Sequence, residues 1–201
     1  MTTIKTRMSR GKRRRVAGRE EILAAARSIG VRDGWKAVTI RSVAQKLGYA
    51  SPLLYEHFND KEDLLTQIAV GGLGELESRL TANLPSNRQA ALLTMVERYW
   101  TFMLEHIQLY RLVNGIDGVP INKSVVGRSA QSLCKVVAEA VRPSMGDSAS
   151  EGEAQTLADE LWALLHGMAE LFLDRVAPFD QEKVTNAAMR LISGAHNRSS
   201  Q

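Results

Sequence analysis

A short stretch near the N-terminus concentrates side chains that could bind a polyanion. Residues 48–65 read GYASPLLYEHFNDKEDLL and carry hydroxyl groups on Ser51 and Tyr55, an imidazole on His57 and an ammonium group on Lys61. Such groups can donate hydrogen bonds to phosphate oxygens or to the edges of bases. The pattern therefore favours recognition of a nucleic acid.

The element that must position these groups is a short helix, which we predict over residues 51–58. Its first residue is a serine suited to the N-cap, and Pro52 fits position N1, where its missing N–H costs nothing. Eight residues are marginal for an isolated helix, so this one must pack on a neighbour. Leu54 and Phe58, at i and i+4, supply that packing face, which leaves Tyr55 pointing outward.

A helix directly before it completes a helix-turn-helix. Thr39 is the predicted N-cap, and Gly48 ends the helix where a left-handed conformation is needed. Ala44, Gly48 and Leu54 then provide the small residue, the turn glycine and the buried aliphatic that this motif requires. The N-terminus of the second helix would enter a major groove.

Lys61 opens a further predicted helix, which follows an N-cap at Asp60 and runs toward Leu80. A cation in the first turn opposes the helix dipole by roughly 0.3–1 kcal/mol, and a nearby phosphate would offset that cost. The alternative is that Glu62 and Asp63 neutralise the ammonium group.

Basic residues are concentrated at the start of the chain. Residues 1–60 contain 13 Lys and Arg against 5 Asp and Glu, whereas residues 61–201 contain 13 against 17. Residues 1–18 have almost no apolar content and should be disordered when free. Their arginines could contact a minor groove or phosphates, although a solubilising tail is the alternative. These arginines are Arg13, Arg14 and Arg15.

Composition and periodicity predict an all-α protein. Aromatic residues make up 5% of the 201 residues, strand-like runs are scarce, and helix formers dominate. A first helix is expected from Arg19 to the break at Gly34. Later helices are predicted at about 87–106, 121–142, 152–175 and 181–194. We expect a disordered arm (1–18), a DNA-binding domain (19–65) and an effector-binding and dimerisation domain (66–196).

Enzyme signatures are missing from the sequence. It contains no GxxxxGK[ST], HExxH or CxxC motif, so we assign no catalytic residue, metal or cofactor. His166 and Glu170 share a helix face, but that pair alone is weak evidence for a metal site. One cysteine, no signal-peptide pattern and no membrane-length apolar run make the cytoplasm the expected location.

Residues 19–65 resemble the DNA-binding domain of the TetR family of bacterial transcriptional regulators, through EEILAAARSIG, VTIRSVAQKLGYA and LLYEHFNDKEDLL. The resemblance implies a dimeric, all-helical regulator whose first three helices bind a palindromic operator. Ala50 stands where the family usually has Ser or Thr. For Tyr55 and His57 the alternative is packing against the next helix. By similarity, the residues at DNA-contacting positions are Thr39, Tyr49, Ser51, Pro52, Tyr55, His57 and Lys61.

The segment ADELWALLHGMAELFLDR is apolar on most sides and so should be buried on two. Its WALLHG sequence resembles the penultimate helix of a subset of TetR-like proteins, which forms a two-fold interface. We predict a homodimer here, with an intrachain core as the alternative. The predicted interface residues are Leu161, Leu165, Met168, Phe172, Val184, Ala188 and Leu191.

The middle helices enclose an effector pocket in this family, although any helical core has a similar apolar stripe. For GGLG, residues 71–74, we predict that the glycines permit close packing or bending of the helix as the head moves, with a simple break between two helices as the alternative. The candidate pocket residues are Trp100, Met103, Leu104, Ile107, Tyr110, Trp162 and His166.

The expected function is that of a ligand-responsive transcriptional regulator, most often a repressor, with double-stranded DNA and an unknown small molecule as partners. The alternative is a non-specific architectural or membrane-surface protein that binds through its basic arm.

Overall fold

The computed structural model describes residues 18–145, 149–175 and 180–198, and within these ranges the chain is helical and contains no strand. The all-α prediction is confirmed. The elements are α1 (Arg19–Asp33), η1 (Trp35–Ala37), α2 (Ile40–Leu47), α3 (Ser51–Tyr55), α4 (Lys61–Thr81), α5 (Arg88–Glu105), α6 (Ile107–Val113), α7 (Lys123–Val141), η2 (Arg142–Met145), α8 (Glu151–Leu173) and α9 (Gln181–Arg198).

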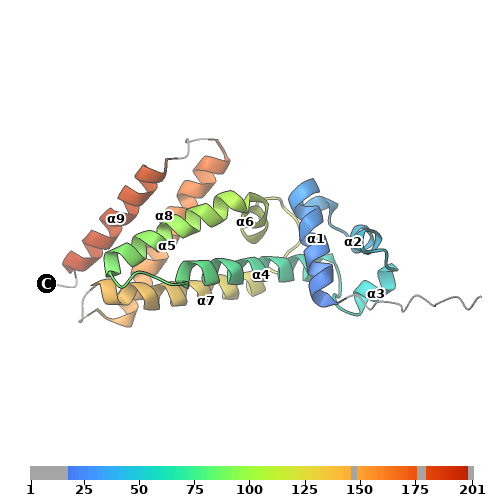
Figure 1. The fold of residues 1–201 in the computed structure, drawn as a ribbon, viewed down its shortest axis with the longest axis horizontal. Helices are drawn as coiled ribbons and strands as arrows, with labels where there is room; N and C mark the ends of the chain where they lie inside the picture. Colours follow the sequence, from blue (N-terminus) through green and yellow to red (C-terminus); the bar gives the residue numbers. More distant parts are fainter. Residues whose placement is uncertain (1–17, 146–148, 176–179, 199–201) are drawn as a thin grey trace, which may run out of the picture.

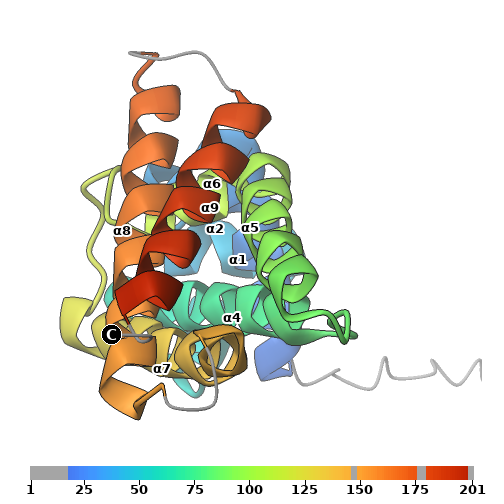
Figure 2. The ribbon, with the colours of Figure 1, turned by 90° about the vertical axis from the view of Figure 1, so that its left-hand side faces the viewer.

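The molecule is elongated, with α1, α2 and α3 gathered at one end (Figure 1). We call these three helices the head and the part formed by α5 to α9 the body. Helix α4 begins in the head and runs along the body beside α7, whereas α5, α8 and α9 cover the other side (Figure 2). The predicted domain boundary at residue 65 therefore falls inside one continuous helix.

Local signals set the end of α1, both ends of α2 and the start of α4 as predicted. Gly34 ends α1 with a φ of 82°, and Gly48 ends α2 in the left-handed region with a φ of 71°. Thr39 caps α2 and forms a capping box with Ser42, since each side chain accepts a hydrogen bond from the other residue's backbone N–H. Asp60 caps α4 by accepting from the N–H of Asp63 at 2.8 Å.

Helix α3 is shorter than the predicted 51–58, because it ends at Tyr55. The predicted cap is also wrong. Ala50 holds the N-cap position in an extended conformation and makes no side-chain cap hydrogen bond. Ser51 is already helical, so Pro52 takes the second position of the first turn, where its missing N–H is still tolerated.

The chain beyond α3 turns toward α4 instead of continuing the helix. The N–H of Asn59 donates to the Asp63 carboxylate at 3.0 Å, which draws this segment onto the first turn of α4. Leu54 and Phe58 are nonetheless both buried, and the N–H of Phe58 bonds the carbonyl of Leu54 at 3.0 Å. The predicted packing face of the short helix is therefore confirmed.

The four predicted helices of the body occur within a few residues of their expected bounds, but α6 was not predicted. His106 separates α5 from α6 with φ −128° and ψ 42°, which breaks the helical path for one residue. Three residues of α6 are buried, namely Leu109, Tyr110 and Leu112. Among the described residues, no helix is long and apolar enough to cross a membrane.

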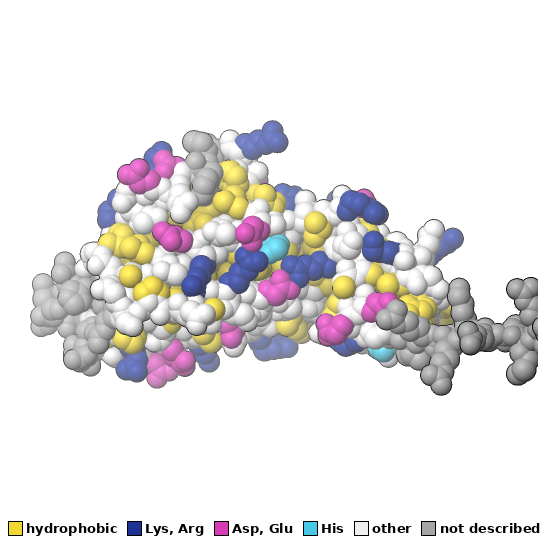
Figure 3. Space-filling view, in the orientation of Figure 1, with side chains coloured by type: hydrophobic (Ala, Val, Ile, Leu, Met, Phe, Trp, Pro, Cys, Tyr) yellow, Lys and Arg dark blue, Asp and Glu magenta, His cyan; other side chains and the backbone are white. Residues whose placement is uncertain are grey.

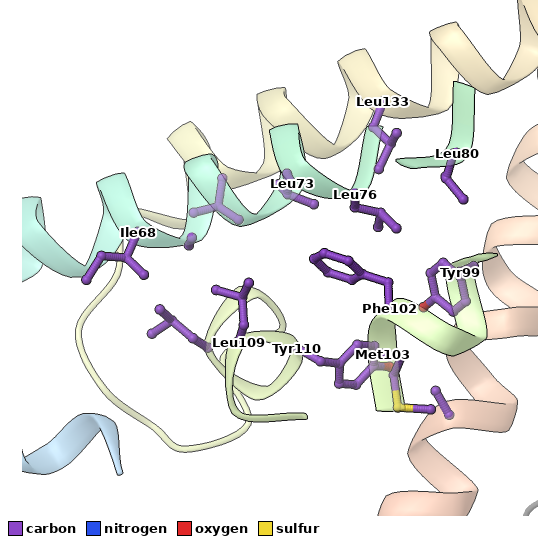
Figure 4. Packing of buried hydrophobic residues seen from close by; sticks show 14 of the residues in the cluster. Ile68, Leu73, Leu76, Leu80, Tyr99, Phe102, Met103, Leu109, Tyr110 and Leu133 are labelled. Carbon is purple, nitrogen blue, oxygen red and sulfur yellow. The ribbon is translucent and has the colours of Figure 1, made fainter. Parts of the chain in front are cut away.

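The GGLG segment lies inside α4, which continues without interruption from Lys61 to Thr81. The alternative, a break between two helices, is therefore wrong. A Cβ added at Gly72 would lie 2.8 Å from both terminal carbons of Leu109 on α6, whereas Gly71 and Gly74 face open space. Gly72 therefore permits close packing of α6 on α4 (Figure 4).

Replacing Gly72 with alanine should destabilise the protein, while Gly74→Ala should stabilise it. Overpacking against Leu109 costs about 1–3 kcal/mol, against a gain in helix propensity of about 1 kcal/mol at either glycine. Urea unfolding of the two variants measures this difference. Equal urea midpoints for the two variants would show that Leu109 and α6 can move away from an added methyl group at Gly72 without loss of stability.

Candidate DNA-binding head and ligand cavity

Helices α2 and α3 pack together through the buried residues Val43, Ala44 and Leu54, which leaves their opposite faces open. On that open side the ring of Tyr55 is 57% exposed. This exposure disfavours the alternative role for Tyr55, packing against the next helix. Thr39 and Pro52 are also exposed, and Tyr49 and Ser51 are half-buried.

His57 sits less openly than predicted for a DNA contact. Its Nε2 atom is buried and makes no hydrogen bond within the part of the chain that the structure describes. Its backbone carbonyl accepts a hydrogen bond from Arg19 at 2.8 Å, and the same guanidinium stacks over Phe58 at 4.5 Å. In this arrangement the main chain of His57 anchors α1, and its Nε2 is shielded from solvent.

Lys61 has a partner within the head. Its Nζ donates to the carbonyl of Lys36 at 3.1 Å, which ties the start of α4 to the segment after α1. Partial burial lowers the pKa of this ammonium group from its ordinary value. This hydrogen bond partly offsets the unfavourable interaction between a cation and the positive N-terminal end of the helix dipole. The Lys61 side chain remains half-buried.

Replacing Lys61 with glutamine should weaken binding to all duplexes by a similar factor. Glutamine keeps a donor for the Lys36 carbonyl but removes the charge, so the salt dependence of log K should fall by about 1. Titrations at several salt concentrations measure that slope, with the exposed Lys135→Gln on α7 as control. An unchanged slope would assign Lys61 to a structural role only.

Helix α2 carries further exposed polar residues, which were not among the DNA-contacting residues predicted from the sequence. Arg41, Gln45 and Lys46 are all exposed, and the first two stand one turn apart. Their i, i+4 spacing was readable from the sequence once Thr39 had been taken as the cap. Arg13, Arg14 and Arg15 lie outside the described residues.

The head end of the molecule is joined to α6 of the body at one point and to α4 at another. The indole N–H of Trp35 donates to the carbonyl of Gln108 on α6 at 2.6 Å, and this ring is only 1% exposed. On the surface, Arg27 of α1 pairs with Glu75 of α4. Basic and acidic side chains interleave along the face of the molecule shown in Figure 3. Because Trp35 is bonded to Gln108, a shift of α6 would also displace the segment that contains Trp35.

Two adjacent cavities lie inside the body. The first has a volume of about 40 Å³ and is lined from α4, α5, α7 and α8. The second has a volume of about 20 Å³ and lies between α4, α5, α6 and α8. Tyr99 and Trp162 line both, with their rings edge to face at 5.9 Å. Figure 4 shows the leucines of α4 facing Phe102, Tyr99 and Leu109 across this region.

A polar cluster lies at the α6–α8 side of the second cavity. The hydroxyl of Tyr110 and Nδ1 of His166 share a hydrogen bond of 2.6 Å, and the same hydroxyl is 3.4 Å from Oε1 of Glu170. Burial, reinforced by Tyr99 and Glu170, raises the pKa of Tyr110, and burial raises that of Tyr99. Both hydroxyls therefore stay protonated at neutral pH.

The predicted pocket residues divide into two groups. Met103, Tyr110 and Trp162 line a cavity, and His166 bonds Tyr110. The remaining three pack in or against the core without lining either cavity: Trp100, Leu104 and Ile107. The missed lining residues of α5 follow a helical i, i+3, i+4, i+7 pattern, so the signal was present: Leu92, Met95, Val96 and Tyr99.

Four of the predicted interface residues lie in the chain's own core. Leu161, Leu165, Val184 and Ala188 are buried within the single chain, so their side chains have little area left for a partner. For these residues the burial agrees with the alternative prediction, in which an apolar face of α8 packs in the core of its own chain. Three residues remain partly exposed: Met168, Phe172 and Leu191.

The comparisons with known proteins agree with this geometry. A model of bacterial regulatory proteins of the tetR family matches residues 22–68, and a model of the tetracyclin repressor-like C-terminal domain matches residues 92–195. The chain belongs to the TetR family. It is a DNA-binding transcriptional regulator with an N-terminal helix-turn-helix, and not an enzyme.

Relatives in this family span most of the chain. An uncharacterised regulator of Mycobacterium tuberculosis, Rv0681, is 27% identical over 187 residues, covering 90% of this chain and 82% of its own. The transcriptional activator FasR of Mycolicibacterium smegmatis is 24% identical, covering 88% and 81%. A Rhodococcus sp. RHA1 protein of unknown function shares the fold with a TM-score of 0.74, at 24% identity over 91% of this chain and 98% of its own.

Proposed function

We propose that this TetR-family regulator is a repressor that leaves a palindromic operator when a small molecule occupies the cavities of the body. The observation that carries the proposal is the Trp35–Gln108 hydrogen bond, because it joins the head to a helix that lines the second cavity. The outward face of α2 and α3 would enter a major groove, led by Pro52 and Tyr55.

Two copies of the chain would read two half-sites about 34 Å apart. The surface we propose for the dimer combines Met168, Phe172 and Leu191 with Leu171, which is 47% exposed and lies on the same stretch of α8. Exposed apolar side chains on two neighbouring helices are typical of a two-fold interface.

The ligand response would pass through α6. Leu109, Tyr110 and Val113 line the second cavity, and Leu109 also packs on Gly72 of α4. A ligand that spreads α5 and α6 would bind the DNA-free arrangement of the heads better than the DNA-bound one. That difference in affinity is what a switch requires.

The proposal is tested by binding of the purified protein to the DNA upstream of its own gene, against a shuffled duplex at about 150 mM salt. A preference of about a thousandfold with a two-fold footprint is expected. Equal binding to both duplexes, lost when residues 1–18 are deleted, would instead favour the non-specific architectural alternative.

The sign of regulation needs a separate measurement, because the relative FasR is an activator. A reporter placed behind the footprinted site should be transcribed less when the protein is present. Increased transcription would overturn the repressor assignment while leaving operator binding intact.

A further inference from the structure

We propose that His106 makes this regulator sensitive to acid: protonation of its imidazole loosens the hold of α6 on α4 and thereby weakens binding of the head to DNA. The inference goes beyond the proposed function, because it needs neither a small molecule nor a particular sign of regulation. It rests on the position of His106 at the joint between two helices and on the charged side chains around its ring.

His106 is the single residue between α5 and α6. Its backbone N–H donates to the carbonyl of Phe102 at 3.0 Å, and its own carbonyl accepts from the N–H of Tyr110 at 2.9 Å. It therefore ends one helix and begins the next, and the direction in which α6 leaves α5 is set here. Gln108, whose carbonyl bonds Trp35 of the head, follows two residues later.

The ring of His106 is held against α4 by Arg79. Nε2 of the ring and Nη2 of Arg79 are 3.3 Å apart, so a neutral ring can accept a hydrogen bond from the guanidinium. The guanidinium also lies over the ring of Phe102 at 5.2 Å, and that ring meets His106 edge to face with centroids 4.7 Å apart. The contact of α4 with the joint therefore depends on an imidazole that has a free lone pair at Nε2.

Four charged side chains face this imidazole from three helices. Arg27 of α1 and Arg79 of α4 oppose its protonation, whereas Glu75 of α4 and Glu105 of α5 favour it. Each glutamate is already paired with an arginine, Glu75 with Arg27 and Glu105 with Arg79. The four charges therefore balance, and partial burial of the ring tips the outcome toward the neutral form. Burial, followed by the two arginines, lowers the pKa of His106 from its ordinary value.

Protonation would reverse the contact with Arg79. An imidazolium has no lone pair at Nε2, so two cations would lie 3.3 Å apart where the hydrogen bond had been. The protonated ring would instead be drawn to Glu105, whose Oε2 atom is 3.9 Å from Nε2. Such a movement turns the joint away from Arg79 and shifts the start of α6, including Gln108.

The sign of the pH dependence follows from the lowered pKa. An exposed His106, in a loosened joint, takes up a proton near its ordinary pKa of about 6.5, before the ring in the docked joint does so. The docked joint is therefore fully favoured above about pH 6.5 and loses stability as the pH falls below that value. Acid thus shifts α6 toward the loosened arrangement.

Operator titrations of the full chain at about pH 7.5 and 5.5, at one salt concentration, compare the parent with His106→Gln. Glutamine can still accept a bond from Arg79 but does not titrate. Acid should weaken operator binding by the parent at least about fivefold more than binding by the variant, the lower end of common coupling between two sites. His57 is present in both proteins, so its titration cancels.

His166→Gln is the matched control, because it removes another histidine of the body. This variant should keep the pH dependence of the parent. Equal pH dependence in the parent and in His106→Gln would overturn the proposal. Hydrogen exchange locates the effect: relative to intrinsic rates, the amides of α6 should exchange faster at about pH 5.5 in the parent but not in His106→Gln.

Two charge variants test the arrangement around the ring without DNA. In NMR titrations the pKa of His106 should rise in Arg79→Gln, which removes a cation, and fall in Glu105→Gln, which removes an anion. The exposed Arg128→Gln on α7 should leave it unchanged. A circular dichroism spectrum and a urea midpoint establish that each variant is folded. Shifts in the same direction, or none in either folded variant, would refute the proposed surroundings of His106.

The acid response and the proposed function fail in different ways. If operator binding is specific but its pH dependence does not involve His106, the regulator assignment stands and the acid response falls. If acid weakens operator binding through His106 while no small molecule does so, the acid response stands and the effector part of the proposed function falls.

Discussion

Replacing Gly30 with alanine should destabilise the head and sharply weaken operator binding. A Cβ at this position would overlap the ring of Trp35, including Cδ2 at 2.8 Å. The ring cannot withdraw, because it is buried and its N–H is bonded to Gln108. Overpacking of this kind costs about 1–3 kcal/mol, occasionally more, and outweighs the gain in helix propensity of about 1 kcal/mol.

Urea unfolding and operator titration measure the effect of Gly30→Ala. Gly74→Ala is the matched control, since it has the same chemistry on a helix but nothing within 4 Å of the added carbon. The control should be up to about 1 kcal/mol more stable than the parent. A Gly30→Ala protein with the parent's urea midpoint and operator affinity would show that the Trp35 ring can move away from position 30.

The second large effect is expected for Trp35→Phe, which should uncouple the head from the body. Phenylalanine fills most of the ring's volume but leaves the Gln108 carbonyl without its donor. Loss of one such hydrogen bond costs about 0.5–1.5 kcal/mol. Helix α6 would then be held to the head mainly by apolar contact, so a ligand bound in the cavity would change operator affinity less.

Hydrogen exchange locates this effect. In Trp35→Phe the amides of α1 and α2 should exchange faster, and those of α7 and α8 should be unchanged. Trp162→Phe changes the same residue type at the cavity, away from Gln108, and should leave exchange in the head alone. Uniform acceleration in every helix would indicate a global loss of stability instead of uncoupling.

The sequence by itself determined the helical class, the family and the ends of most head helices. These features depend on interactions within a few residues, such as the Thr39 capping box, the left-handed conformation at Gly48 and the Asp60 cap. Local hydrogen bonds and backbone preferences are readable from residue types and spacing alone. Both failures in this region concern α3, where Ala50 supplies no capping side chain and the helix ends at Tyr55 instead of continuing to Phe58.

Tertiary structure alone decided what each apolar face packs against. Periodicity shows that a helix such as α8 has two apolar stripes, but it does not distinguish its own core from a partner chain. For that reason Leu161 and Leu165 were assigned to an interface although they are buried within one chain. The same holds for Gly72 against Leu109 and for Trp35 against Gln108, which are brought together from 37 and 73 residues apart. Contacts at such separations leave no local pattern in the sequence, and in this protein they join the cavity to the head.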